Sequence, residues 1–179
     1  ALPSTPQYGG SLRLGIIDGS KTGDLDAHKP LTTGAIIRGF ALYSKLWEWG
    51  EAMTPELALA EEVDVNDNAS LWTIRLRKDL EFHNGKTITA DDLIFSARRL
   101  SDPALASPYL AYLQWIDRDN LIKVDERTVR IPIKGGRGLL SLPDSWVNFG
   151  GLVPEDYHPV TNPVGAGPFK LKEFVPGQR

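Results

Sequence analysis

The stretch LWTIRLRKDLEFHNGKTITADDLIFSARRL, residues 71–100, carries the clearest structural signals of the chain. In residues 72–77 apolar side chains alternate with polar ones, which is typical of a half-buried strand. Asn84-Gly85 then predicts a tight turn, because both residue types tolerate positive φ. Thr89, followed three residues later by Asp92, forms a capping-box pattern. We therefore expect a strand, a turn and a capped helix in this order.

The same stretch also contains a longer signature. Its three parts are Trp72-Thr73-Ile74-Arg75-Leu76-Arg77, Phe82-His83-Asn84-Gly85-Lys86 and Thr89-Ala90-Asp91-Asp92. On these motifs, which match in order and spacing, the chain resembles the bacterial extracytoplasmic solute-binding proteins of family 5, which serve peptide-class ABC transporters. The resemblance implies an α/β fold of the two-lobed periplasmic-binding-protein type II, with the ligand enclosed between the lobes. It also implies a protein that is not an enzyme.

The resemblance divides the chain into three parts. Residues 1–44 would begin the main sheet of the first lobe, and residues 163–179 would return to that sheet. Residues 45–162 would form the subdomain that peptide-type members insert into the first lobe. Because members of the family are much longer, we expect only part of the first lobe in this chain, with the second lobe absent from it.

Helical spacing of apolar residues is visible in two places. Residues 35–48 carry apolar side chains at helical intervals and predict an amphipathic helix. In the helix that follows the capping box, Leu93, Ala97 and Leu100 share one face. Residues 54–58 place Pro directly after Thr, which predicts the start of another short helix.

Strand-like alternation appears at both ends of the chain and near its middle. Residues 12–16 and 169–171 each predict a strand. Residues 121–124 and 128–133 flank a polar turn and predict a hairpin. Pro132 lacks a backbone donor, so we expect the second hairpin strand to lie at a sheet edge.

Composition narrows the class of protein. The chain has 179 residues, 41% hydrophobic and 24% charged, with a formal net charge of −3. Nucleic-acid binding usually requires a basic surface, so we expect no nucleic-acid partner. No apolar run approaches the roughly 20 residues that cross a bilayer, so we expect no direct membrane insertion. The chain contains no cysteine, which excludes disulfides, thiolate metal sites and cysteine nucleophiles.

Catalytic motifs are absent from the sequence. It contains neither a Gly-x-Ser-x-Gly elbow nor a His-Glu-x-x-His pair. The three histidines, His28, His83 and His158, show no metal-binding spacing, so we expect no metal site, no catalytic residue and no cofactor. Asp91 and Asp92 are adjacent carboxylates, but helix capping explains them without catalysis. A small hydrolase that uses Asp91, Asp92 or His83 remains an alternative of a different class.

The resemblance also indicates which residues contact the ligand. Residues 102–114, DPALASPYLAYLQ, are similar to the oligopeptide-binding branch, where the tyrosine that matches Tyr109 lies at the ligand cleft. The segment after LDAHK contributes as well, and it places Leu31, Thr32 and Thr33 at the cleft. Leu31 stands where that branch has an acidic contact. We expect a peptide-like ligand, and an opine, a glycoside, a nickel chelate or a haem remains open.

The resemblance implies a specific role and location. The protein would be the substrate-binding component of an ABC importer, capturing its solute in the periplasm and delivering it to an inner-membrane permease. We expect a monomer at full length. Residues 1–4 show no basic, apolar leader, as in an exported protein whose signal peptide has been removed. Arg179 fits a tryptic cut or a chosen end of the chain.

Overall fold

The computed structural model of the protein describes residues 9–17 and 25–176. Residues 1–4 and 179, on which the expectations about a leader and a cut rest, lie outside this part. The helices and strands, in chain order, are α1 (Thr33–Leu42), β1 (Trp47–Trp49), β2 (Pro55–Leu57), β3 (Ala60–Val65), β4 (Leu71–Leu76), α2 (Ala90–Leu100), η1 (Pro103–Leu105), α3 (Leu110–Leu113), β5 (Ile122–Asp125), β6 (Thr128–Pro132), η2 (Lys134–Gly136) and α4 (Leu142–Phe149).

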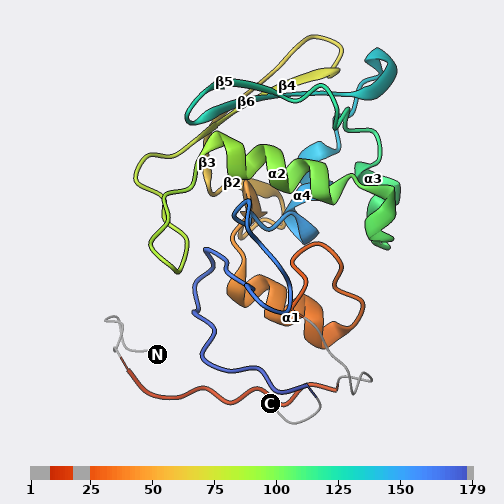
Figure 1. The fold of residues 1–179 in the computed structure, drawn as a ribbon. Coiled ribbons are helices and arrows are strands. Elements are labelled where there is room, and N and C mark those ends of the chain that lie inside the picture. The colour runs from red at the N-terminus through yellow and green to blue at the C-terminus, as the bar shows by residue number, and fades with distance from the viewer. Residues whose placement is uncertain (1–8, 18–24, 177–179) are drawn as a thin grey trace.

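A four-stranded antiparallel sheet with the order β3-β4-β6-β5 forms one layer (Figure 1). β4 is the strand expected from the alternation in residues 72–77, and β5 and β6 form the expected hairpin. In the β4–β6 ladder, Trp72 lies opposite Ile131 and Ile74 lies opposite Val129. All four side chains are buried, so they form one apolar face of the sheet.

The helix α2 covers the buried face of this sheet (Figure 1). Leu93, Ala97 and Leu100 are fully or almost fully buried there, which confirms the predicted helix face. Trp47 and Trp146 extend the same core, and their rings meet edge to face. Burial of each large apolar side chain contributes about 1.5–3 kcal/mol, so this core is the main source of stability in the described region.

The predicted capping box is present at the start of α2. The Thr89 backbone N–H donates to Asp92 Oδ2 at 2.9 Å, and the Thr89 hydroxyl donates to the same oxygen at 3.1 Å. The other carboxylate oxygen of Asp92 accepts from Lys86 Nζ and from the Glu155 N–H. Asp92 is fully buried, so one carboxylate joins the turn, the helix start and a segment 63 residues away.

The helix expected over residues 35–48 is shorter than predicted. α1 ends at Leu42, and Tyr43 is already extended, with φ −123° and ψ 113°. Tyr43 packs in a separate cluster, whereas Trp47 lies in β1 and packs in the main core. Because these two side chains enter different clusters, one continuous helix does not accommodate both.

The short helix expected at residues 54–58 is wrong. Residues 55–57 form β2, which pairs with β1 so that Trp47 lies opposite Leu57. Pro after Thr fits a helix start, but it also fits the end of an edge strand, where no donor is needed. Pairing with β1 selects the strand.

The strands expected at residues 12–16 and 169–171 are absent from the described structure. Leu12, Leu14 and Phe169 are 79%, 64% and 63% exposed, and the segments that contain them have no ladder partner among the described residues. Alternation gives a strand only where a second strand supplies hydrogen bonds.

The edge position expected for the strand with Pro132 is also wrong. β6 lies between β4 and β5. Pro132 pairs with Leu71, but the β5 ladder begins only at Ile122 opposite Arg130. Pro132 therefore lies beyond the end of β5, where no strand on that side requires its missing N–H.

A second, smaller cluster is separate from the main core and joins distant parts of the chain. It consists of Leu25, Ala27, Leu42, Tyr43, Val153 and Tyr157. Residues 162–169 pass over the end of α1, where the Gly167 N–H donates to Leu42 O at 2.8 Å. A Cβ at Gly165 would overlap the Leu42 carbonyl oxygen, so only glycine fits at this crossing. This cluster holds the segment that leads into α1.

Candidate functional site

Residues 25–33, which lead into α1 and include its first residue, are fixed by an ion pair. Arg99 of α2 donates from both terminal nitrogens to the two carboxylate oxygens of Asp26, each at 2.7 Å. Burial raises the pKa of Asp26, but hydrogen bonds from Arg99 and from the His28 N–H outweigh burial, so the pKa lies below its ordinary value. Two parallel hydrogen bonds to a planar guanidinium fix both position and orientation.

Two tyrosines hold the backbone of the same segment. The Tyr43 and Tyr157 hydroxyls donate to Leu25 O at 2.6 and 3.0 Å. The Ala27 N–H donates to the Tyr157 hydroxyl oxygen at 2.9 Å. Burial raises the pKa of Tyr157 to about 12, so this hydroxyl keeps its proton and remains a donor at neutral pH.

His28 lies at the centre of this anchor. Its ring is fully buried, and Nε2 lies 2.7 Å from Gly151 O, so the neutral ring donates there. Burial, assisted by the positive charge of Arg99, lowers the pKa of His28 to about 4. Among the described residues, Nδ1 has no hydrogen-bond partner. His28 is therefore a neutral structural residue at pH 7.

A hydrogen bond joins this segment to the one that contains Tyr109. Ser107 Oγ donates to His28 O at 2.8 Å and accepts from the Tyr109 N–H at 3.2 Å. Tyr109 follows Ser107 by two residues, and Leu31 follows His28 by three. The structure thus brings together the two segments that carry the four predicted ligand residues.

The three predicted residues at the start of α1 differ in their surroundings. Leu31 is 60% exposed and Thr33 is exposed at the first helical position. Thr32 caps the helix, and its hydroxyl oxygen accepts from the Ala35 N–H at 3.1 Å. Leu31 and Thr33 are therefore accessible to a ligand, whereas the position of Thr32 is explained by capping alone.

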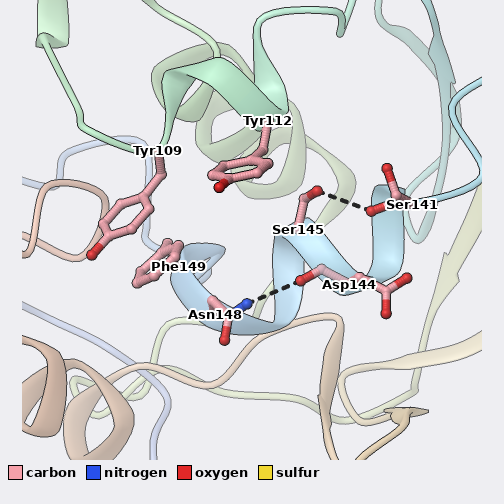
Figure 2. A pocket seen from close by; sticks show the side chains of 7 residues that line it. All are labelled: Tyr109, Tyr112, Ser141, Asp144, Ser145, Asn148 and Phe149. Atoms are coloured by element: carbon pink, nitrogen blue, oxygen red, sulfur yellow. Dashed lines mark hydrogen bonds between the residues drawn. The ribbon is translucent and has the colours of Figure 1, made fainter.

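Tyr109 borders a cavity between α3 and α4, which we term the α3–α4 pocket (Figure 2). Its volume is about 570 Å³, within the range of small-molecule sites. The Tyr109 ring stacks on Phe149, with 14° between the ring planes. The residues that line the pocket are Tyr109, Tyr112, Ser141, Asp144, Ser145, Asn148 and Phe149. Of these, only Tyr109 was expected from the sequence.

The lining residues on α4 follow a helical spacing that can be read from the sequence. Ser141 and Ser145 are four residues apart, as are Asp144 and Asn148, so they occupy one side of the helix. Leu142, Trp146 and Val147 occupy the opposite, buried side. An amphipathic pattern over residues 141–149 would have indicated an accessible polar face.

The three residues of the hydrolase alternative each make a contact within the fold. Asp92 is buried in the capping box, and Asp91 pairs with Lys123 at 2.7 Å. Nε2 of His83 lies 2.8 Å from Gly167 O, in the loop that crosses α1. Within residues 9–17 and 25–176, no group of three or more His, Asp or Glu is arranged to hold a metal ion.

A family model matches the part of the chain that contains the four-stranded sheet, the capping box and the loop that crosses α1. Residues 54–179 match the model of bacterial extracellular solute-binding proteins, family 5 Middle. The chain belongs to this family. The fold is accordingly that of the type II periplasmic binding proteins, as the signature in residues 72–92 implied.

Two curated relatives are similar to different shares of this chain, and each match covers less than a third of the relative. The periplasmic oligopeptide-binding protein OppA of Haemophilus influenzae is 43% identical over 61 residues, 34% of this chain and 11% of OppA. The probable peptide-binding protein YejA of Agrobacterium fabrum is 33% identical over 186 residues, 94% of this chain and 29% of YejA.

A solved structure is also similar to most of this chain, and this chain covers about a third of it. The structure of MoaA from A. tumefaciens R10 in complex with mannopinic acid is 30% identical, with a TM-score of 0.75 over 89% of this chain and 34% of MoaA. The chain thus spans about a third or less of the length of each of these relatives. In the part of the chain that the structure describes, no helix has the length and apolar character of a membrane span.

Proposed function

We propose that the protein is the substrate-binding component of an ABC importer that captures a peptide-like solute in the periplasm and delivers it to an inner-membrane permease. The observation that carries this proposal is the hydrogen bond from Ser107 to His28 O, within a family of solute-binding proteins. It joins the segment of Tyr109 to that of Leu31, Thr32 and Thr33, which are the four residues that we assign to ligand contact. The protein would act as a monomer at full length, without catalysis.

The domain arrangement belongs to the same proposal. Residues 1–44 and 163–179 would form part of the main sheet of the first lobe, and residues 45–162 would form the inserted subdomain. The cluster around Tyr43 and Tyr157 takes side chains from residues 25–43 and from residues 153–157, so it would be the contact between these two parts. Closure of a second lobe over Tyr109 and Leu31 would then enclose the ligand, as hinge motions do in lobed binding proteins.

A peptide is the ligand that we favour, because two of the similar proteins carry peptide-binding names. A peptide offers a donor and an acceptor at each bond, so it binds well through its backbone. An opine is the second candidate, since MoaA was solved in complex with mannopinic acid. Leu31 is apolar, so its side chain does not distinguish a peptide from an opine by charge.

The test is to obstruct the proposed cleft at an exposed position. Leu31→Trp enlarges a side chain that is 60% exposed, so it should not disturb the core. Val160→Trp is the matched control, because Val160 is 76% exposed and outside the proposed cleft. Both variants would be expressed from the chromosomal locus of the native host and titrated with defined tri- to pentapeptides by calorimetry.

We expect Leu31→Trp to weaken peptide binding at least about tenfold and Val160→Trp to leave it unchanged, since a misplaced ring displaces ligand contacts worth about 1.4 kcal/mol or more. Equal affinity in both variants would contradict the assignment of Leu31 to the cleft. Absence of peptide binding by the wild-type protein, together with tight binding of an opine, would replace the peptide with the second candidate.

A further inference from the structure

The α3–α4 pocket contains one negative charge that no neighbour neutralises. Asp144 is the only charged residue in the lining, and its side chain is exposed. Its carboxylate makes no hydrogen bond or ion pair with any described residue. Asp144 lies in the first turn of α4, where it complements the helix dipole. That role does not require an aromatic-walled cavity beside it.

Two other polar side chains in the lining donate hydrogen bonds within α4. Ser145 Oγ donates to Ser141 O at 2.9 Å, and Asn148 Nδ2 donates to Asp144 O at 3.1 Å. Asn148 Oδ1 accepts from Trp49 Nε1 at 3.1 Å, so the orientation of the amide is fixed from both ends. The one charged group that this face of α4 presents to the pocket, the Asp144 carboxylate, is an acceptor, so the face suits a ligand group that donates hydrogen bonds.

The aromatic residues form the remainder of the pocket. Figure 2 shows Tyr109 stacked with Phe149 at one end and Asp144 at the other, with Tyr112 between them. The Tyr112 side chain is 60% exposed and leaves much of its surface open to a ligand. An aromatic surface beside a carboxylate attracts an organic cation, through the ring quadrupole as well as through charge.

The layout of the pocket matches one kind of side chain. A long apolar stem fits along Tyr112, and a cationic head reaches Asp144. A planar guanidinium pairs with a carboxylate through two hydrogen bonds and stacks on aromatic rings, whereas an ammonium does so less well. Because Tyr109 also borders the proposed cleft, a ligand held there would extend a side chain into the pocket.

We propose that the α3–α4 pocket binds the guanidinium-bearing side chain of a peptide ligand, with Asp144 as its ion-pair partner and Tyr112 packed against its stem. This proposal rests on the proposed function and adds the class of peptide, one that contains arginine. Asp144 and Tyr112 are then residues that determine specificity.

The experiment compares three peptides that differ at one position, Ala-Arg-Ala, Ala-citrulline-Ala and Ala-Ala-Ala. Citrulline keeps the length and planarity of arginine and removes its charge. The protein is expressed from its chromosomal locus as wild type, Asp144→Asn and Tyr112→Ala, and affinities are measured by calorimetry at low and high salt. Asp119→Asn is the matched control, because it removes the same charge from an exposed position outside the pocket.

We expect the wild type to bind Ala-Arg-Ala at least about tenfold more tightly than Ala-citrulline-Ala, as a hydrogen-bonded charge pair is typically worth that factor or more. The preference should shrink at high salt and disappear in Asp144→Asn, whereas Asp119→Asn should retain it. Tyr112→Ala should weaken binding of both long side chains and leave Ala-Ala-Ala unchanged.

Two other outcomes separate this proposal from the one on which it rests. If the wild type binds all three peptides equally, the assignment of the pocket is wrong and the peptide-binding function stands. If it binds none of the three at any salt concentration, the peptide-binding function itself is overturned, and the assignment of the pocket with it. Unchanged thermal unfolding of each variant shows that the comparison reports on binding.

Discussion

Acidification should lower the free energy of unfolding through protonation of His28, which lies in the segment that leads into α1. The ordinary pKa of histidine is 6.5, and burial lowers that of His28 to about 4. Between these two pH values His28 is protonated in the unfolded chain and neutral in the folded protein, so the free energy of unfolding falls as the pH falls. Above pH 6.5 the side chain is neutral in both states and has no effect. The loss grows to about 2 kcal/mol near pH 5 and approaches about 3 kcal/mol below pH 4.

The assay is urea unfolding at several pH values between about 7.5 and 5, with His28→Gln as the comparison. Glutamine does not titrate, and its side-chain amide can donate to Gly151 O in place of Nε2. The free energy of unfolding of the wild type should fall relative to that of His28→Gln by about 2 kcal/mol over this range. Other titrating groups cancel in the difference. A difference that is constant with pH would refute the reasoning, because it would mean that His28 has the same pKa in both states.

Two further predictions concern the contacts that hold the fold. Gly165→Ala should lower the free energy of unfolding by about 3 kcal/mol, because its methyl group would overlap a backbone carbonyl. The control is Gly39→Ala in α1, which meets no atom within 4 Å and should stabilise the protein by up to about 1 kcal/mol. Equal unfolding midpoints for the two variants would contradict the close crossing of residues 162–169 over α1. Asp92→Asn should lower the free energy of unfolding by about 2 kcal/mol, because it removes the charge from a fully buried side chain that pairs with the partly exposed Lys86. Asp91→Asn, which breaks a partly exposed pair with Lys123, should shift the urea midpoint much less. A similar midpoint for both variants would show that the capping box does not depend on the buried charge.

The local elements were predicted well where one short signal decides the outcome. The alternation in residues 72–77 and the pair Thr89 and Asp92 act over a few residues, so the strand and the capped helix follow from the sequence. Residues 54–58 failed because proline fits both a helix start and a strand end, and pairing with β1 decided between them. Alternation in residues 12–16 failed for a related reason, since a strand also needs a partner.

The candidate site could be predicted only in part from the sequence. Tyr109 and Leu31 were found by resemblance, not by periodicity. The contacts that place them join Arg99 to Asp26 across 73 residues and His28 to Gly151 across 123 residues. Contacts at such separations leave no local pattern in a single sequence. The α3–α4 pocket did not follow from the resemblance, because most of its lining lies on α4, a helix for which no family motif is present.

The most direct test of the account is to identify what the protein carries. The protein is purified from its native host, its mass is measured under native and denaturing conditions, and any molecule released on denaturation is identified. We predict an adduct that is lost on denaturation and resolves into a ladder of peptide masses. One discrete non-peptide mass would contradict the peptide assignment, and a protein that carries and binds no solute would contradict the proposed function as a whole.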